Sequence, residues 1–221
     1  MIENVLKDEI IHLLPNIFSR VLTINFFDEK FILQVKQKQG SSLKGIITDD
    51  TQNVPCEDQF NCLYHITLGR EELPFENNSF TLVIGENILS DCFNLAQTIN
   101  ELNRVLINDG ILITAEPNVQ YYRHVLKLLQ GTWDDTLEES KTRLHFFTPS
   151  SVATILNNSS FLVRVLSPIE IDSADSFPLS EDGFVHVNRY HIGPLSHEEY
   201  RVFLIKKFLA VASKTNGGDT G

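Results

Sequence analysis

The chain has 221 residues, 42% of them hydrophobic and 21% charged, a length and composition that suit one well-buried globular domain. Its 18 Lys and Arg against 29 Asp and Glu leave a formal charge of −11, and no basic run offers a stripe to a phosphate backbone or an anionic membrane. Nucleic acid is therefore excluded as an expected partner, and so is a membrane span, because no apolar run approaches the roughly 20 residues that one requires.

The first predicted elements alternate between helix and strand. Apolar residues recur at helical spacing in MIENVLKDEIIHLLPNIF, which predicts an N-terminal helix over 1–18 and argues against a signal peptide. A β-branched run from Arg20 predicts a strand that ends at Ile24, a helix follows over about 28–38, and LKGIIT predicts a second strand over 43–48. Strand, helix and strand in this order begin a βαβ unit.

The middle of the chain continues the alternation. Its predicted elements are a polar loop over 49–61, a third strand near CLYHITL, a fourth strand over 80–84, a helix capped at Ser90 and Asp91 that stops at 108–110, and a fifth strand, ILITAEPN. We expect Ile24 at the end of a central first strand, and Ile46, Val83 and Ile113 on neighbouring strands of the same core.

The last third is less regular. Its predicted elements are a helix over 119–129, the irregular stretch QGTWDDTLEESKTRLHFF, a helix over 149–157 behind the cap Thr148, the strand FLVRVLS, an unassigned stretch over 172–195, a helix opened by the capping box Ser196-x-x-Glu199, and the closing strand FLAVAS. Alternating strands and helices predict a largely parallel sheet that is covered on both faces. Residues 1–213 should form a single domain, and 214–221 a disordered tail.

The three cysteines form no pattern typical of a disulfide framework, so we expect a cytoplasmic protein. CEDQFNCLYH brings Cys56, Cys62 and His65 within ten residues, but the C-x₂₋₄-C pair typical of a zinc site is missing. No metal site is expected.

The segment LPFENNSFTLVIGENILSDCFNLAQTINELNRVLINDGILITAEPN resembles the middle of a class I S-adenosylmethionine-dependent methyltransferase, of the type 11-like group. The similarity is specific at 73–75 (Leu-Pro-Phe), 104–106 (Arg-Val-Leu) and 116–118 (Glu-Pro-Asn). Downstream, GTWDD…RLHFFT resembles a segment of methyltransferases that often accompany bacterial glycan synthesis. The resemblance runs from about Arg20 to Ser213. It implies an α/β, Rossmann-like, seven-stranded sheet that is mostly parallel, with its last strand antiparallel and helices on both faces.

The resemblance also locates a cofactor pocket, and there the sequence departs from the family. The family has a Gly-x-Gly-x-Gly turn after strand one, where this chain has Asn25-Phe26-Phe27-Asp28-Glu29. A carboxylate that holds the ribose hydroxyls is replaced by Ile47, with Asp49 two residues on, and an Asp facing the adenine is replaced by Arg70. The candidate cofactor-binding residues are Asn25, Phe26, Asp28, Asp49, Arg70, Gly85 and Glu86.

These replacements predict that S-adenosylmethionine binding is weak or absent. Loss of a carboxylate that accepts two hydroxyl hydrogen bonds, at on the order of 1.5–3 kcal/mol per charge-assisted bond, weakens binding roughly 10²-fold or more. Two phenylalanines at this turn add a steric obstacle and also remove the freedom to adopt a positive φ. The rings of Phe26 and Phe27 are expected to fill the vacated pocket, and a new ligand site is the alternative.

Two functions therefore remain. The first is a methyltransferase-like protein that is non-catalytic and serves as an accessory or regulatory partner, with a protein partner or a homodimer. The second is an active methyltransferase that acts on a hydroxyl of a glycan or another small-molecule acceptor. For the second, Glu116 and His145 are the candidate catalytic residues, acting in positioning or as a general base. The alternatives are a loop-bracing carboxylate for Glu116 and a structural role for His145. Trp133, Tyr121 and Tyr122 form either an acceptor wall or part of the lid and core.

Overall fold

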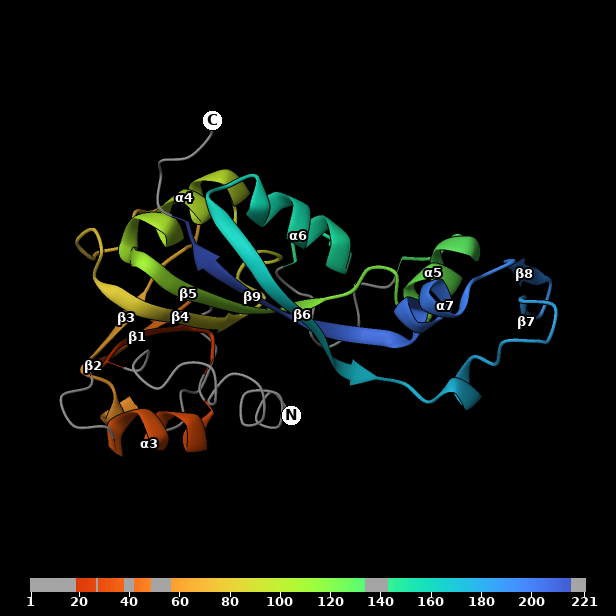
Figure 1. Ribbon diagram of the computed structural model, residues 1–221, viewed down its shortest axis with the longest axis horizontal. Coiled ribbons are helices and arrows are strands. Elements are labelled where there is room, and N and C mark those ends of the chain that lie inside the picture. Colours follow the sequence, from red (N-terminus) through yellow and green to blue (C-terminus); the bar gives the residue numbers. More distant parts are fainter. Residues whose placement is uncertain (1–18, 27, 38–41, 49–56, 134–142, 216–221) are drawn as a thin grey trace.

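The computed structural model describes residues 19–26, 28–37, 42–48, 57–133 and 143–215 (Figure 1). The predicted N-terminal helix over 1–18 lies outside the described residues, as do Phe27, Asp49 and most of the predicted tail.

The centre of the molecule is a seven-stranded sheet in the order β3-β2-β1-β4-β5-β9-β6. β9 runs antiparallel to both of its neighbours, β5 and β6, while the other pairs are parallel. The prediction of a mostly parallel sheet with an antiparallel last strand is confirmed. The strands are β1 (Arg20–Ile24), β2 (Ser42–Ile47), β3 (Cys62–His65), β4 (Phe80–Glu86), β5 (Leu106–Pro117), β6 (Phe161–Ile171) and β9 (Ile205–Lys214).

Two helix starts follow the predicted caps and one does not. α6 (Pro149–Asn157) begins behind Thr148, and α7 (His197–Leu204) begins behind Ser196, each with a capping box. α4 (Leu95–Val105) was expected to be capped at Ser90 and Asp91, but its N-cap is Asn94, whose side chain accepts a hydrogen bond from the backbone N–H of Gln97. Among the described residues, the other α-helices are α3 (Glu29–Gln37) and α5 (Tyr122–Leu129).

A hydrophobic core lies on each face of the sheet. Figure 1 shows α4 and α6 on one face and α3 on the other. Ile24, Ile46 and Val83 belong to the core beneath α4 and α6, whereas Ile113 belongs to the core beneath α3. The four residues share one sheet as predicted, but the prediction of a single shared core is wrong for Ile113, because successive strand side chains point to opposite faces.

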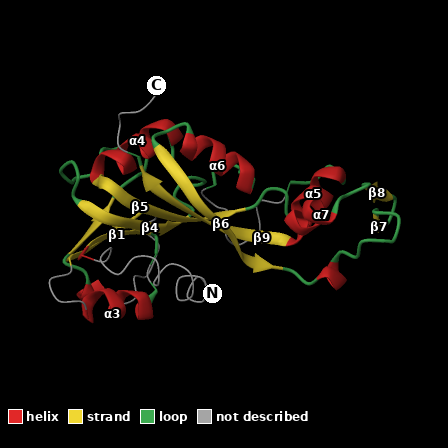
Figure 2. Cartoon of the chain, in the orientation of Figure 1, coloured by secondary structure: helices red, strands yellow, loops and turns green. Residues whose placement is uncertain are grey.

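Beyond one end of the sheet lies a second group of elements, which we call the distal lobe (Figure 2). Its elements are α5, α7, the short 3₁₀ helix η4 (Ala174–Ser176) and the antiparallel pair β7 (Val185–Val187) and β8 (Tyr190–Ile192). They pack around a third cluster that includes Tyr122, Phe177 and Tyr200. The unassigned stretch 172–195 therefore supplies η4 and the β7–β8 hairpin. β6 and β9, which are longer than predicted, reach from the sheet toward this lobe (Figure 1).

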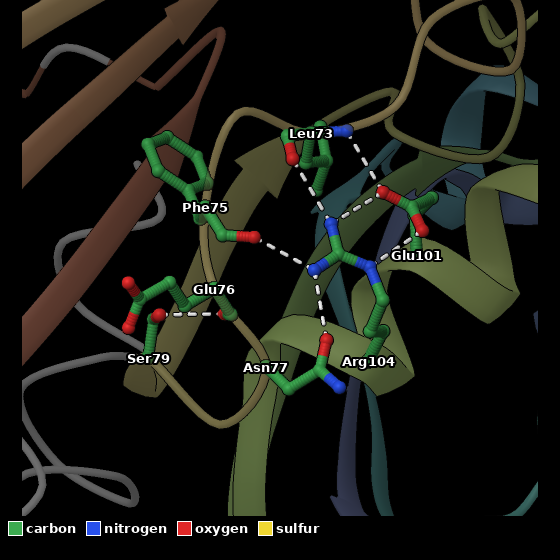
Figure 3. Close-up of polar contacts among 7 residues, drawn as sticks. All are labelled: Leu73, Phe75, Glu76, Asn77, Ser79, Glu101 and Arg104. Atoms are coloured by element: carbon green, nitrogen blue, oxygen red, sulfur yellow. Dashed lines mark hydrogen bonds and ion pairs between the residues drawn. The ribbon is translucent and has the colours of Figure 1, made fainter.

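Two of the motifs shared with the family, 73–75 and 104–106, meet at Arg104 (Figure 3). Its guanidinium donates hydrogen bonds to the carbonyl oxygens of Leu73 and Phe75, at 2.9 and 2.7 Å, and to the Asn77 side chain at 3.1 Å. It also forms an ion pair with Glu101 at 2.7 Å, and Glu101 in turn accepts a hydrogen bond from the backbone N–H of Leu73. The Arg104 network therefore ties the loop before β4 to the last turn of α4. The hydrogen bond from Arg104 is the main cause that lowers the pKa of Glu101.

Candidate functional site

The candidate site lies where β1, β2, β4 and β5 end, which we call the carboxyl edge. In parallel α/β sheets, ligands bind in the crevice outside the carboxyl ends of the strands. Asn25 follows β1, Thr48 follows β2, and Glu86 and Pro117 end β4 and β5. The pairing of Ile24 with both Ile46 and Gly85 places the ends of these first three strands side by side.

Asn25 makes the turn after β1 and joins it to the end of β2. Its φ is 50°, the left-handed conformation, which Asn tolerates better than most residues. Its side-chain NH₂ donates to Thr48 Oγ1 at 2.6 Å, and its side-chain oxygen accepts from the Thr48 backbone N–H at 3.0 Å. The left-handed residue of this turn is therefore Asn25, one position before the two phenylalanines.

The next two described residues of the turn contact α3. The Phe26 side chain is 3% exposed and packs edge-on against Phe31, with the ring centroids 5.3 Å apart, in the core beneath α3. Asp28 Oδ1 accepts a hydrogen bond from the Phe31 backbone N–H at 2.7 Å, as an N-cap residue does. These contacts assign Phe26 to the core between α3 and the sheet, and Asp28 to the start of α3. Phe27 lies outside the described residues.

Gly85 and Glu86 end β4 next to β1. A Cβ at Gly85 would lie 2.3 Å from the Ile24 carbonyl oxygen, so only glycine permits this close approach. Glu86 Oε2 lies 2.6 Å from Nζ of Lys207 on β9, whose side chain is only 13% exposed. The carboxylate at the end of β4 is therefore neutralised from within the chain.

Arg70 lies in the connection between β3 and β4. Its guanidinium carbon is 3.9 Å from the centroid of the Phe93 ring, and both side chains are exposed. Stacking of a guanidinium on an aromatic face is favourable. The position predicted to face adenine thus carries a cation that is stacked on a neighbouring loop, while Asp49 lies outside the described residues.

Glu116 is fully buried near the end of β5. Its oxygens accept hydrogen bonds from the backbone N–H groups of Leu89 and Ser90, at 2.9 and 3.1 Å, and from the Thr114 hydroxyl at 2.5 Å. Burial raises the pKa of this carboxyl against the opposing effect of these bonds. Such contacts are those of a carboxylate that braces the loop after β4 (residues 87–94).

The segment that contains His145 also contacts this loop. The backbone N–H groups of Leu144 and His145 both donate to the Ser90 carbonyl oxygen, at 2.8 and 2.9 Å. Within the described part of the chain, the His145 Nε2, Ser90 Oγ and Arg143 Nε atoms are buried without a hydrogen-bond partner. Ser90 therefore links the candidates Glu116 and His145. Sequence reasoning treated Ser90 as a helix cap and missed this link, although its place soon after a parallel strand was a usable signal.

The aromatic residues proposed as an acceptor wall separate into two groups. Tyr121 and Tyr122 are 5% exposed and both donate to Asp172 Oδ2, so they belong to the distal-lobe core. Trp133 is 43% exposed and packs edge-on against Phe146, with the ring centroids 5.1 Å apart. Both rings border a cavity of about 10 Å³, which is room for about one water molecule.

Two kinds of site are not found in the part of the chain that the structure describes. No three His, Cys, Asp or Glu residues gather there as metal ligands, and Cys56 of the rejected cluster lies outside that part. No helix in the same residues has the length and apolar character that a membrane crossing requires.

Comparisons with known proteins agree with this architecture. Residues 10–114 match the family model described as "Methyltransferase domain". Similar solved structures include S-adenosylmethionine-dependent methyltransferases from Mesorhizobium loti (TM-score 0.59, 13% identity, covering 92% of this chain and 94% of that one) and Archaeoglobus fulgidus (0.58, 14%, 96% and 94%). The fold is that of S-adenosylmethionine-dependent methyltransferases. A chain in the complex between the Haloferax volcanii Trm112 methyltransferase activator and a methyltransferase is also similar (0.57, 14%, 97% and 94%). No curated protein matches the chain.

The family model matches fewer than half of the residues, so the comparisons show the methyltransferase fold for this chain. Identities of 13–14% show the fold alone, so any activity has to be argued from the residues of the site.

Proposed function

We propose that the chain is a non-catalytic methyltransferase-like protein that acts as an accessory or regulatory partner. The observation that carries the proposal is the bridge between Asn25 and Thr48. By resemblance, the turn after β1 and the end of β2 are where the cofactor's amino-acid end and ribose would lie. Here their polar groups bond to each other, and a ligand must first break bonds that contribute about 1 kcal/mol each.

Other contacts at the carboxyl edge support weak or absent cofactor binding. Glu86 is neutralised by Lys207, and Arg70 brings a cation where the family has an adenine-facing carboxylate. Asp28 already accepts a hydrogen bond as the cap of α3. None of these residues presents a carboxylate with both oxygens free toward the edge.

The partner is a protein, either a different chain or a second copy of this one. One structure with this fold was solved as a complex between a methyltransferase and the Trm112 methyltransferase activator. That complex supports the general idea that a methyltransferase-fold chain assembles with a regulatory protein. The activator's identity is not carried over to this chain.

A second candidate is an active methyltransferase that acts on a hydroxyl of a glycan or another small-molecule acceptor. Two observations favour it. First, Asn25 keeps the left-handed backbone that a glycine turn would supply. Second, Ser90, Arg143 and His145 have buried polar atoms without a hydrogen-bond partner among the described residues, at or next to the loop after β4 that Glu116 braces. Buried polar atoms without a partner are uncommon, so a ligand or water that satisfies them is a reasonable expectation. In this candidate His145 is the general base and Glu116 holds the loop that positions it.

Isothermal titration calorimetry with S-adenosylmethionine and S-adenosylhomocysteine tests the proposal. We expect no binding tighter than roughly 100 µM at neutral pH, about −5.5 kcal/mol. Low-micromolar binding would reject the non-catalytic function and favour the second candidate. Methyl transfer to hydroxyl acceptors, compared between the parent and His145→Gln, would then test the base.

A further inference from the structure

A groove in the distal lobe lies apart from the carboxyl edge residues described above. It has a volume of about 630 Å³ and is walled by η4, the loop over 178–183 and the side of α7 that bears His197 and Tyr200. Ligand sites in proteins commonly have volumes of about 300–1,000 Å³. The groove is therefore large enough to take a side chain together with part of the backbone that carries it.

The groove is negatively charged. Asp175 and Glu181 line it, both exposed, and no Lys or Arg is among its described lining residues. No ion pair involves either carboxylate within the described residues. The other titratable side chains that line the groove are His197 and Tyr200, and the Asp175 charge adds to burial in raising the pKa of Tyr200. Carboxylates along a concave wall focus a negative potential there.

Part of the groove lining is apolar. Pro178, Leu179 and Leu195 line it beside the carboxylates. A lining that combines apolar side chains with carboxylates matches a long cationic side chain, because Lys and Arg lay their methylene stems on apolar surface while the charged head reaches an anion. A small inorganic cation would leave the apolar side chains uncovered.

Hydrogen bonds within the chain hold both walls of the groove in place. The Tyr200 hydroxyl donates to the Phe177 carbonyl oxygen at 2.8 Å, which joins α7 to the end of η4. The Leu195 N–H donates to the Gly183 carbonyl oxygen at 2.8 Å, and the Gly183 N–H donates to that of Ser180 at 3.0 Å. A preformed site avoids the entropic cost of ordering loops on binding.

We infer that this groove binds an arginine-bearing segment of a partner protein, with the guanidinium between Asp175 and Glu181 and the stem on Leu179 and Leu195. Arginine is favoured over lysine because its planar fork can pair with carboxylates through two parallel hydrogen bonds. The inference deepens the proposed accessory function and rests on it for the existence of a partner.

The test uses the peptide acetyl-Ala-Leu-Arg-Leu-Ala-amide, carrying an uncharged fluorophore, and a matched peptide with citrulline in place of arginine. Citrulline keeps the shape and removes the charge. We expect the full-length protein to bind the arginine peptide at least tenfold more tightly in fluorescence anisotropy, with the difference shrinking as salt is raised. In the variant Asp175→Asn/Glu181→Gln, affinity for the arginine peptide should fall about tenfold or more, to the citrulline level.

Glu198→Gln is the matched control, because Glu198 is an exposed carboxylate of the same lobe that does not line the groove. It should change the affinity less than twofold, and thermal melting should confirm that all variants fold. Absence of arginine-peptide binding at millimolar concentration, or equal losses in the control and the double variant, would overturn the inference. Cofactor titration reports on the carboxyl edge and the peptide on the groove, so either proposal can fail alone.

Discussion

The Arg104 network and the turn at Asn25 both lie in segments with counterparts in the methyltransferase family. They differ in whether the residues typical of the family are present. Around Arg104 the motif residues are present, and they hydrogen-bond to one another across the loop before β4 and α4 (Figure 3). At Asn25 the glycine-rich turn is replaced by residues that bond to Thr48 and cap α3. The resemblance is thus strongest where residues fold the chain and weakest where they would meet a ligand.

The physical reason lies in what each region would lose by substitution. Without Arg104, the carbonyl oxygens of Leu73 and Phe75 lose a charged donor, and the whole fold bears the cost. A residue whose only role is to contact a cofactor carries no such structural penalty. A chain that keeps its fold and loses its ligand would therefore change at the carboxyl edge first, which agrees with the proposed non-catalytic function.

The largest expected effect tests whether the Arg104 network stabilises the fold. Arg104→Ala should lower the free energy of unfolding by about 3 kcal/mol, because it removes several charge-assisted hydrogen bonds at a partly buried position. Urea denaturation followed by circular dichroism measures it. The control, Arg201→Ala, alters an exposed arginine on α7 and should stay within about 0.5 kcal/mol of the parent. Equal losses in the two variants would contradict the role assigned to Arg104.

The Arg104 network should also affect how the stability of the protein depends on pH. The pKa of Glu101 is lowered, first by its hydrogen bond from Arg104. A carboxyl whose folded-state pKa is depressed contributes stability that is present above its unfolded value of 4.5 and is lost as pH falls through the folded value. The decline in stability below about pH 4.5 should therefore be shallower in Arg104→Ala than in the parent.

The next largest effect is expected at Glu116, which belongs to the family-like motif 116–118 and also braces the loop after β4. Glu116→Ala should cost about 2–3 kcal/mol, since it leaves the buried N–H groups of Leu89 and Ser90 unpaired, and Glu116→Gln should cost less. The raised pKa fixes the sign of the pH effect: stability from this group is complete below pH 4.5 and is lost as pH rises through the folded-state pKa. Glu116→Gln should remove this dependence, and a variant with the parent's full pH profile would contradict the assignment.

The sequence predicted the fold class because local signals and the resemblance agreed. Thr148 and Ser196 cap their helices through bonds to residues three positions on, so a short window of sequence contains the whole interaction. The true start of α4 was missed because Ser90 has the residue type of a cap but is held by Glu116, which lies 26 positions away.

The candidate site was less predictable for the same physical reason. Phe26 was expected at the carboxyl edge, and only its contact with Phe31 shows that its ring lies beneath α3. The ion pair between Glu86 and Lys207 joins residues 121 positions apart. Neither interaction leaves a local pattern, because both depend on how distant strands and helices pack.

Smaller effects are expected at the turn at Asn25. Asn25→Ala should cost about 2 kcal/mol, from the lost bridge to Thr48 together with a left-handed φ that alanine adopts poorly. Asn25→Gly loses the bridge but relieves the backbone strain, so its cost should be about 1 kcal/mol. Chemical denaturation of both variants measures the difference. If glycine were as costly as alanine, the turn would not be under the conformational constraint that the structure shows.

The smallest expected effect is a gain of binding. If the bridge closes the carboxyl edge, Asn25→Gly with Thr48→Asp should open it and supply a ribose-binding carboxylate, placed at the partly exposed Thr48 because Ile47 is buried. A ligand present at its own dissociation constant stabilises a protein by RT ln 2, about 0.4 kcal/mol, which for this chain length is a melting shift of roughly 1 °C. S-adenosylhomocysteine should produce such a shift in the low-millimolar range, growing with concentration. Asn25→Gly with Thr48→Asn is the neutral control and should respond less. A parent that responds as strongly as the variant would show that the edge was open from the start, whereas a folded variant that ignores the ligand would place the obstacle at Arg70 and not at the bridge.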